Sequence, residues 1–212
     1  MNILFFGDSN THGSNPVEGG RHGRDSRFTG ILQKELGENY YIIEEGLGGR
    51  TAVFEDPLAE GRCGIDYISP CLNTHKPLDL IVVMLGTNDT KPIFNANARC
   101  INIGIQRLLK CILHHGDAFR DKCNILLVSP CVIKPGASER IKTMDDDCTK
   151  KSEELIPLLE NTAEEMGLYY MAASDFAEVS DEDKVHLDAA GHRKLADAFK
   201  VKILEIESLI NS

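Results

Sequence analysis

The chain contains several short apolar runs in which polar and apolar residues do not alternate, and these runs limit the folds that it can adopt. The clearest is Leu-Ile-Val-Val-Met-Leu at residues 80–85, which ends at Gly86. A strand without a polar face must be covered on both sides, as it is in a parallel sheet flanked by helices. Runs of this kind predict strands at residues 3–6, 40–43, 80–85, 125–128 and 168–171.

Longer stretches with helical periodicity alternate with these runs and predict helices at residues 28–36, 101–113, 144–166 and 189–210. We expect a break or kink near Pro157, a cap from Asp188 on the last helix, and His192 on that helix's surface. The alternation predicts a three-layer α/β/α fold with a flavodoxin-like, doubly wound sheet of about five parallel strands. Because no linker or repeat interrupts the 212 residues, we expect a single domain over residues 1–212.

The formal net charge of -10 argues against nucleic acid and anionic membranes as partners, because both need a basic surface. The chain has seven cysteines, an odd number, and no two are spaced as in zinc or thioredoxin-type motifs. The run at 3–6 is too short for a signal peptide, and the run at 80–85 is too short to span a bilayer. We therefore expect a cytoplasmic protein with reduced thiols.

Polar segments follow the predicted strands at the point where each strand ends. The carboxyl ends of parallel strands meet at one edge of the sheet, and open α/β sheets bind ligands at that edge. We therefore expect four segments to converge there, beside the polar loop at 13–24. They are Gly-Asp-Ser-Asn at 7–10, Gly-Leu-Gly-Gly-Arg-Thr at 46–51, Gly-Thr-Asn-Asp at 86–89 and Asp-Lys-Val-His at 183–186.

These segments contain the groups that acyl transfer requires. A serine hydroxyl such as that of Ser9 is a weak nucleophile and needs an adjacent base, which His186 can supply. Asp183, three residues earlier, can reach Nδ1 of the imidazole, fix its tautomer and stabilise its protonated form. The oxyanion also needs donors, and the candidates are the backbone N–H groups of Ser9 and Gly49 and the side-chain amide of Asn88. Each segment alone fits a turn or a helix cap, but together they supply every role.

The four segments resemble the conserved blocks of the SGNH, or GDSL-type, hydrolases, which are named for a Ser, a Gly, an Asn and a His. Ser9, Gly49, Asn88 and His186 match these four residues, with Gly48 as a competing alignment for the glycine. The blocks span residues 7 to 186. The resemblance implies a serine esterase that acts on small carboxylic esters through an acyl-serine intermediate.

Two further details follow from the resemblance. Asp183 matches the Asp of the family's Asp-x-x-His block, whereas Asn10 stands where many members carry Leu. The family mechanism implies no metal and no organic cofactor.

The stretches at 44–51 and 78–91 are similar to one branch in particular, the bacterial arylesterases, some of which transfer acyl groups to alcohols in water. This similarity implies aryl or short-chain acyl esters as substrates. It also implies a homo-oligomer in which loops of neighbouring subunits narrow the active site. The segments at 93–99 and 134–144 are the candidates for such loops.

The same residues are compatible with three functions other than that of a small-ester esterase. The first is a carbohydrate O-deacetylase, of the acetylxylan or sialate type, that uses the same triad. The second is a metal-dependent phosphoesterase with Asp8, Asn88, Asp183 and His186 as ligands. The third is a non-catalytic binding module. The α/β-hydrolase fold is excluded, because Thr11 occupies the last glycine position of its Gly-x-Ser-x-Gly motif.

Overall fold

The structure, a computed structural model, describes residues 1–211. Within these residues five strands form one all-parallel sheet in the order β2-β1-β3-β4-β5. The order is that of flavodoxin-like sheets and confirms the predicted doubly wound fold. The strands are β1 (Asn2–Gly7), β2 (Tyr41–Gly46), β3 (Leu80–Met84), β4 (Ile125–Ser129) and β5 (Tyr169–Ala172).

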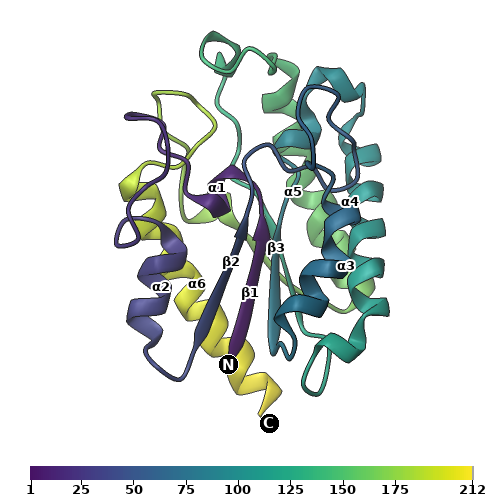
Figure 1. The fold of residues 1–212 in the computed structure, drawn as a ribbon. Coiled ribbons are helices and arrows are strands. Elements are labelled where there is room, and N and C mark those ends of the chain that lie inside the picture. Colours follow the sequence, from purple (N-terminus) through teal and green to yellow (C-terminus); the bar gives the residue numbers. More distant parts are fainter. Residues whose placement is uncertain (212) are drawn as a thin grey trace.

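Helices cover both faces of the sheet and give the three predicted layers (Figure 1). On one face lie α2 (Phe28–Leu36) and α6 (Ala189–Ile210). On the other lie α3 (Gly64–His75), α4 (Ala98–His114) and α5 (Asp147–Met166).

The apolar composition of β1 follows from these two layers. Alternate side chains of the strand enter two separate cores, with Leu4 and Phe6 facing one helical layer and Ile3 and Phe5 the other. None of the four is more than 1% exposed. Burial of a side chain such as Phe contributes about 1.5–3 kcal/mol to stability.

The helices α3 and α5 differ from the prediction, and α4 extends beyond the predicted 101–113 at both ends. The helix α3 was not predicted, because Pro70 interrupts its pattern and only a few of its residues are buried. The helix α5 begins at Asp147 and continues through Pro157, so the expected break is absent. The helices α2 and α6 have the predicted bounds, and the Asp188 carboxylate caps α6 by accepting a hydrogen bond from the Gly191 N–H.

The expectation that His192 lies on the surface was wrong. Its side chain is 0% exposed, because α2 packs over this part of α6, and the ring contacts those of Phe28 and His22. Nδ1 of His192 accepts a hydrogen bond from the Phe28 N–H at 3.4 Å. Burial lowers the pKa of His192 to about 3, so the ring is neutral at physiological pH.

Two further observations concern the chain as a whole. Across residues 1–211, none of the helices has the length and apolar character needed to cross a membrane. All seven cysteines are free thiols.

Candidate active site

Ser9 begins a short helix, α1 (Ser9–His12), that directly follows β1. The Asp8 carboxylate caps α1 by accepting a hydrogen bond from the Asn10 N–H at 2.9 Å. As the first residue of the helix, Ser9 has an N–H group that no carbonyl of the helix can accept. Gly46 lets α1 lie against the end of β2, since a Cβ at this position would stand 2.1 Å from the backbone nitrogen of His12. Sequence and packing thus place the Ser9 hydroxyl at the carboxyl edge of the sheet.

Ser9, His186 and Asp183 form a hydrogen-bonded row. The Ser9 hydroxyl lies 2.8 Å from Nε2 of His186, and Nδ1 of His186 lies 2.5 Å from Oδ2 of Asp183. Although burial alone would raise the pKa of Asp183, hydrogen bonds from the His186 side chain and backbone lower it below its ordinary value. An ionised Asp183 holds the proton of the imidazole on Nδ1, which leaves Nε2 free to accept the Ser9 proton.

The backbone around Asp183 is shaped to present both side chains. Oδ1 of Asp183 accepts hydrogen bonds from the N–H groups of Val185 and His186, at 3.0 and 2.9 Å. The chain can curl in this way because Lys184 adopts a left-handed conformation with φ of 67°. Such a conformation costs a non-glycine residue about 1–3 kcal/mol, which the hydrogen bonds of the loop offset.

The second candidate oxyanion donor lies in a tight turn after β2. The Arg50 N–H closes this turn by donating to the Leu47 carbonyl at 3.0 Å, so the Gly49 N–H is left out of the closing hydrogen bond. Gly49 has φ of 80°, as the third position of a type II turn requires. A Cβ there would stand 3.5 Å from Cδ of Arg62, so the backbone conformation, and not crowding, requires glycine.

The third candidate donor, Asn88, is linked to the same turn. Its side chain is buried, and its amide donates one hydrogen bond to the Arg50 carbonyl at 3.1 Å. An amide group has two N–H donors, so one remains for an oxyanion. The turn that contains Gly49 and the amide of Asn88 are therefore held in a fixed relation.

Arg50 has a structural role that the sequence analysis missed. Its side chain is buried, its Nη1 donates to the carbonyls of Gly7 and Glu45, and its guanidinium lies over the Phe6 ring, 4.2 Å from the centroid. It also lies 5.4 Å from the centroid of the Tyr67 ring. Arg50 thus ties together the carboxyl ends of β1 and β2. The position of Arg50 directly after two glycines is the feature of the sequence that could have indicated this role.

Asp89 binds the backbone two residues after the turn of residues 47–50. Its side chain is 0% exposed, and its Oδ1 accepts a hydrogen bond from the Ala52 N–H at 2.8 Å. Burial raises the pKa of Asp89 to about 7. Burial also raises the pKa of Asp8, whose side chain is 1% exposed. Two carboxyl groups beneath the site therefore resist ionisation.

Substitution of Asp89 by asparagine is expected to remove a pH dependence of stability. The native state keeps the Asp89 proton up to about pH 7, whereas the unfolded chain loses it near its ordinary pKa of 3.8. Unfolding therefore releases a proton in this window, and the free energy of unfolding falls as pH rises through it. Between about pH 5 and about pH 8, urea titrations should show the wild type losing about 2–3 kcal/mol more than Asp89→Asn.

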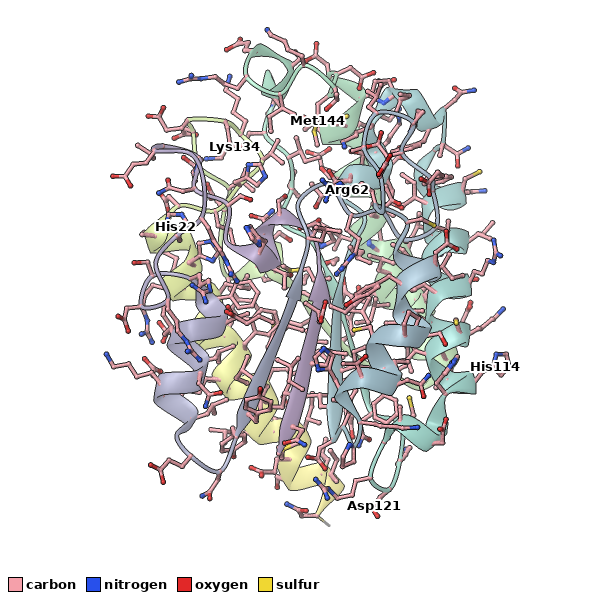
Figure 2. The ribbon with its side chains drawn as sticks, viewed as in Figure 1. His22, Arg62, His114, Asp121, Lys134 and Met144 are labelled. Atoms are coloured by element: carbon pink, nitrogen blue, oxygen red, sulfur yellow. The ribbon has the colours of Figure 1, made fainter. Side chains whose placement is uncertain are left out.

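The control for this experiment is Asp121→Asn, at an exposed residue near the opposite end of the molecule (Figure 2). This variant should lose stability with pH as the wild type does. Equal losses in Asp89→Asn and the wild type would contradict the assignment of a protonated Asp89.

Within residues 1–211, two groups of side chains have donor atoms close enough to hold a metal ion. They are Glu45 with Cys71 and His75, and Glu55 with Cys63 and Asp66. Glu45 already accepts a hydrogen bond from His75, and its carboxylate lies 4.0 Å from the guanidinium of Arg50. The positive charge of Arg50 next to Glu45 disfavours the binding of a metal ion there.

Neither group contains the ligands of the phosphoesterase alternative. Both carboxylate oxygens of Asp183 accept hydrogen bonds from N–H groups within its own loop. Asp8 caps α1, and Asn88 donates to a backbone carbonyl. The side chains of Asp8, Asn88, Asp183 and His186 are therefore engaged in separate hydrogen bonds and do not form a set of metal ligands. Ser9, His186 and Asp183, by contrast, form a hydrogen-bonded row.

Comparisons with known proteins show which family the chain is similar to. The model of the GDSL-like Lipase/Acylhydrolase family matches residues 5–194. The native aryl esterase of M. smegmatis is 32% identical, with a TM-score of 0.90, over 96% of this chain and 98% of that one. Est24, a carbohydrate acetylesterase from Sinorhizobium meliloti, is 32% identical, with a TM-score of 0.91, over 97% of this chain and 99% of that one. No curated protein matches the chain.

Proposed function

Because the chain belongs to the GDSL-like lipase/acylhydrolase family and is an esterase of the SGNH type, we propose that it hydrolyses small carboxylic esters through an acyl-serine intermediate on Ser9. The observation that carries this proposal is the hydrogen-bonded row from Ser9 through His186 to Asp183, with distances of 2.8 and 2.5 Å. The 2.8 Å contact between the Ser9 hydroxyl and Nε2 of His186 is within the range that proton transfer to a base requires, which supports the proposal.

The reaction proceeds in two halves. In the first, the Ser9 proton passes to Nε2 of His186 while Oγ attacks the ester carbonyl carbon. The N–H groups of Ser9 and Gly49 and the amide of Asn88 stabilise the oxyanion of the tetrahedral intermediate. His186 then protonates the leaving alcohol. In the second half His186 takes a proton from water, whose oxygen attacks the acyl carbon. His186 then returns that proton to Oγ as the bond between the acyl group and Oγ breaks, which releases the acid and restores Ser9.

We propose aryl or short-chain acyl esters as the substrates, with transfer of the acyl group to an alcohol as a competing outcome. The similarity to the aryl esterase of M. smegmatis supports this choice. The alternative is removal of acetyl groups from carbohydrates, which the similarity to the carbohydrate acetylesterase Est24 favours to the same degree. The proposed triad and oxyanion donors serve both reactions equally well.

Three further proposals concern the whole protein. One domain over residues 1–212 is supported by a single sheet to which elements from β1 to α6 contribute. A cytoplasmic location is supported by seven free thiols. A homo-oligomer is supported by exposed apolar side chains such as Ile93, which is 44% exposed, in a segment expected to meet a neighbouring subunit.

The test of the proposed function is a pre-steady-state experiment with p-nitrophenyl acetate, with and without a chelator. A burst of about one nitrophenolate per active site is expected, because an acyl-serine enzyme releases the alcohol before it hydrolyses the acyl group. The chelator is expected to have no effect. Turnover that requires a metal ion, or no turnover of any ester, would contradict the proposal.

A second measurement separates the two substrate classes. The value of kcat/KM is compared between aryl acetates and acetylated xylan or O-acetylated sialic acid. A preference of more than about tenfold for one class, or about 1.4 kcal/mol in transition-state binding, identifies the substrate that the site fits better.

Substitution of Asn88 by alanine is expected to lower kcat about 10²–10³-fold and to change KM little, because an oxyanion donor acts mainly on the transition state. The kinetics of p-nitrophenyl acetate hydrolysis measure both constants. A matched control is Asn102→Ala, which removes another buried amide side chain, on α4. A rise in KM with unchanged kcat would show that Asn88 binds substrate and is not an oxyanion donor.

A further inference from the structure

The side chain of Asn10 connects the helix of the nucleophile to the loop of the base. Its Nδ2 donates a hydrogen bond to the Val185 carbonyl at 3.1 Å, and its Oδ1 accepts one from the Leu187 N–H at 2.9 Å. The two partners are the residues on either side of His186. Asn10 is 5% exposed, so both hydrogen bonds are buried.

Few side chains can make this pair of contacts. The loop presents a carbonyl and an N–H group, so the contacting side chain must carry one donor and one acceptor close together, as an amide does. A leucine would leave both backbone groups buried without hydrogen-bond partners, which destabilises the loop. An aspartate would keep the acceptor but place a carboxylate oxygen against the Val185 carbonyl.

The rest of this loop is fixed from elements other than α1. The His186 carbonyl accepts a hydrogen bond from the Ser180 N–H at 2.7 Å, and the Leu187 carbonyl lies 3.3 Å from Nε2 of His22. Asn10 therefore makes the two hydrogen bonds that tie the backbone around His186 to the helical turn that begins with Ser9.

From this geometry we propose that Asn10 is a positioning residue that sets the distance between the Ser9 hydroxyl and Nε2 of His186. The inference rests on the proposed function, because it assigns Asn10 a part in the proton transfer from Ser9. Asn10 follows Ser9 directly, so its two hydrogen bonds hold α1 against the backbone on both sides of His186. This attachment keeps the Ser9 hydroxyl and Nε2 of His186 at their 2.8 Å contact.

The experiment compares Asn10→Leu and Asn10→Asp with the wild type in the burst of p-nitrophenyl acetate. The first variant removes both hydrogen bonds, and the second removes only the donor to Val185, so it carries the test if the first does not fold. In each folded variant the burst rate constant and kcat should fall about tenfold or more, because a small misplacement of a base slows proton transfer. The burst amplitude should stay near one per site, and KM should change less than about threefold.

Asn124→Leu is the matched control. Asn124 is 6% exposed, and its amide donates to the Asp79 carbonyl at 3.0 Å, near the amino end of β4. It should lose stability as the Asn10 variants do, but keep the wild-type burst rate. A folded Asn10 variant with a wild-type burst rate would overturn the positioning role alone. An inactive wild type would overturn the proposed function and the role together.

Discussion

Substitution of Ser9 by alanine is expected to lower ester turnover by about 10⁴–10⁶-fold and to abolish the burst of p-nitrophenyl acetate. The reason is that, in the proposed mechanism, the hydroxyl supplies the oxygen that becomes acylated, and serine enzymes lose activity on this scale without their nucleophile. The fold should persist, because the hydroxyl makes its hydrogen bond to the half-buried His186 side chain and not to the backbone of the sheet or the helices. Circular dichroism and the unfolding midpoint check that the variant is native.

A matched control for this substitution is Ser129→Ala. Ser129 is also buried, at the carboxyl end of β4, which is separated from β1 in the sheet by β3, and its hydroxyl accepts a hydrogen bond from Tyr170 at 3.0 Å. The control should keep kcat within about threefold of the wild type, because it removes a hydroxyl from the same sheet edge without touching the triad. If Ser9→Ala retained wild-type turnover and burst amplitude, the nucleophile would have to be sought elsewhere.

Substitution of Asp183 by asparagine is expected to lower kcat by about 10⁴-fold, the scale seen when other catalytic triads lose this carboxylate. Asparagine can still accept hydrogen bonds from the Val185 and His186 N–H groups, so the loop keeps its shape. Its amide N–H₂, however, would donate to Nδ1 of His186 and force the ring proton onto Nε2. Such a ring cannot accept the Ser9 proton.

The kinetics of Asp183→Asn are measured beside those of Asp181→Asn. Asp181 lies two residues earlier and carries the same charge, but its side chain is 92% exposed and pairs with Lys134. Loss of this exposed charge should change kcat less than about threefold, because solvent screens it. A kcat for Asp183→Asn within about tenfold of the wild type would contradict the assigned role of the carboxylate.

Much of the fold is readable because its strands and two of its helices are encoded locally. The run at 80–85 has no polar position, and β3 is fully buried at every residue. The helices at 28–36 and 189–210 have the predicted bounds, because their apolar positions recur with helical spacing. The expectation that His192 lies on the surface failed because α2 covers it, and the residues around His192 in the sequence do not indicate that contact.

The residue types that a serine esterase needs, and their positions after the strands, can be read from the amino-acid sequence. The reason is that the chemistry of a hydroxyl, an imidazole or a carboxylate belongs to a single side chain, and that parallel strands end at one edge of the sheet. That Ser9 and His186, 177 positions apart, meet at hydrogen-bond distance follows from tertiary packing alone. The same holds for the hydrogen bonds of Asn10 to the backbone on both sides of His186, and for the burial of Arg50 against the carboxyl ends of β1 and β2. Such contacts depend on the packing of distant segments, which the local pattern of residues does not specify.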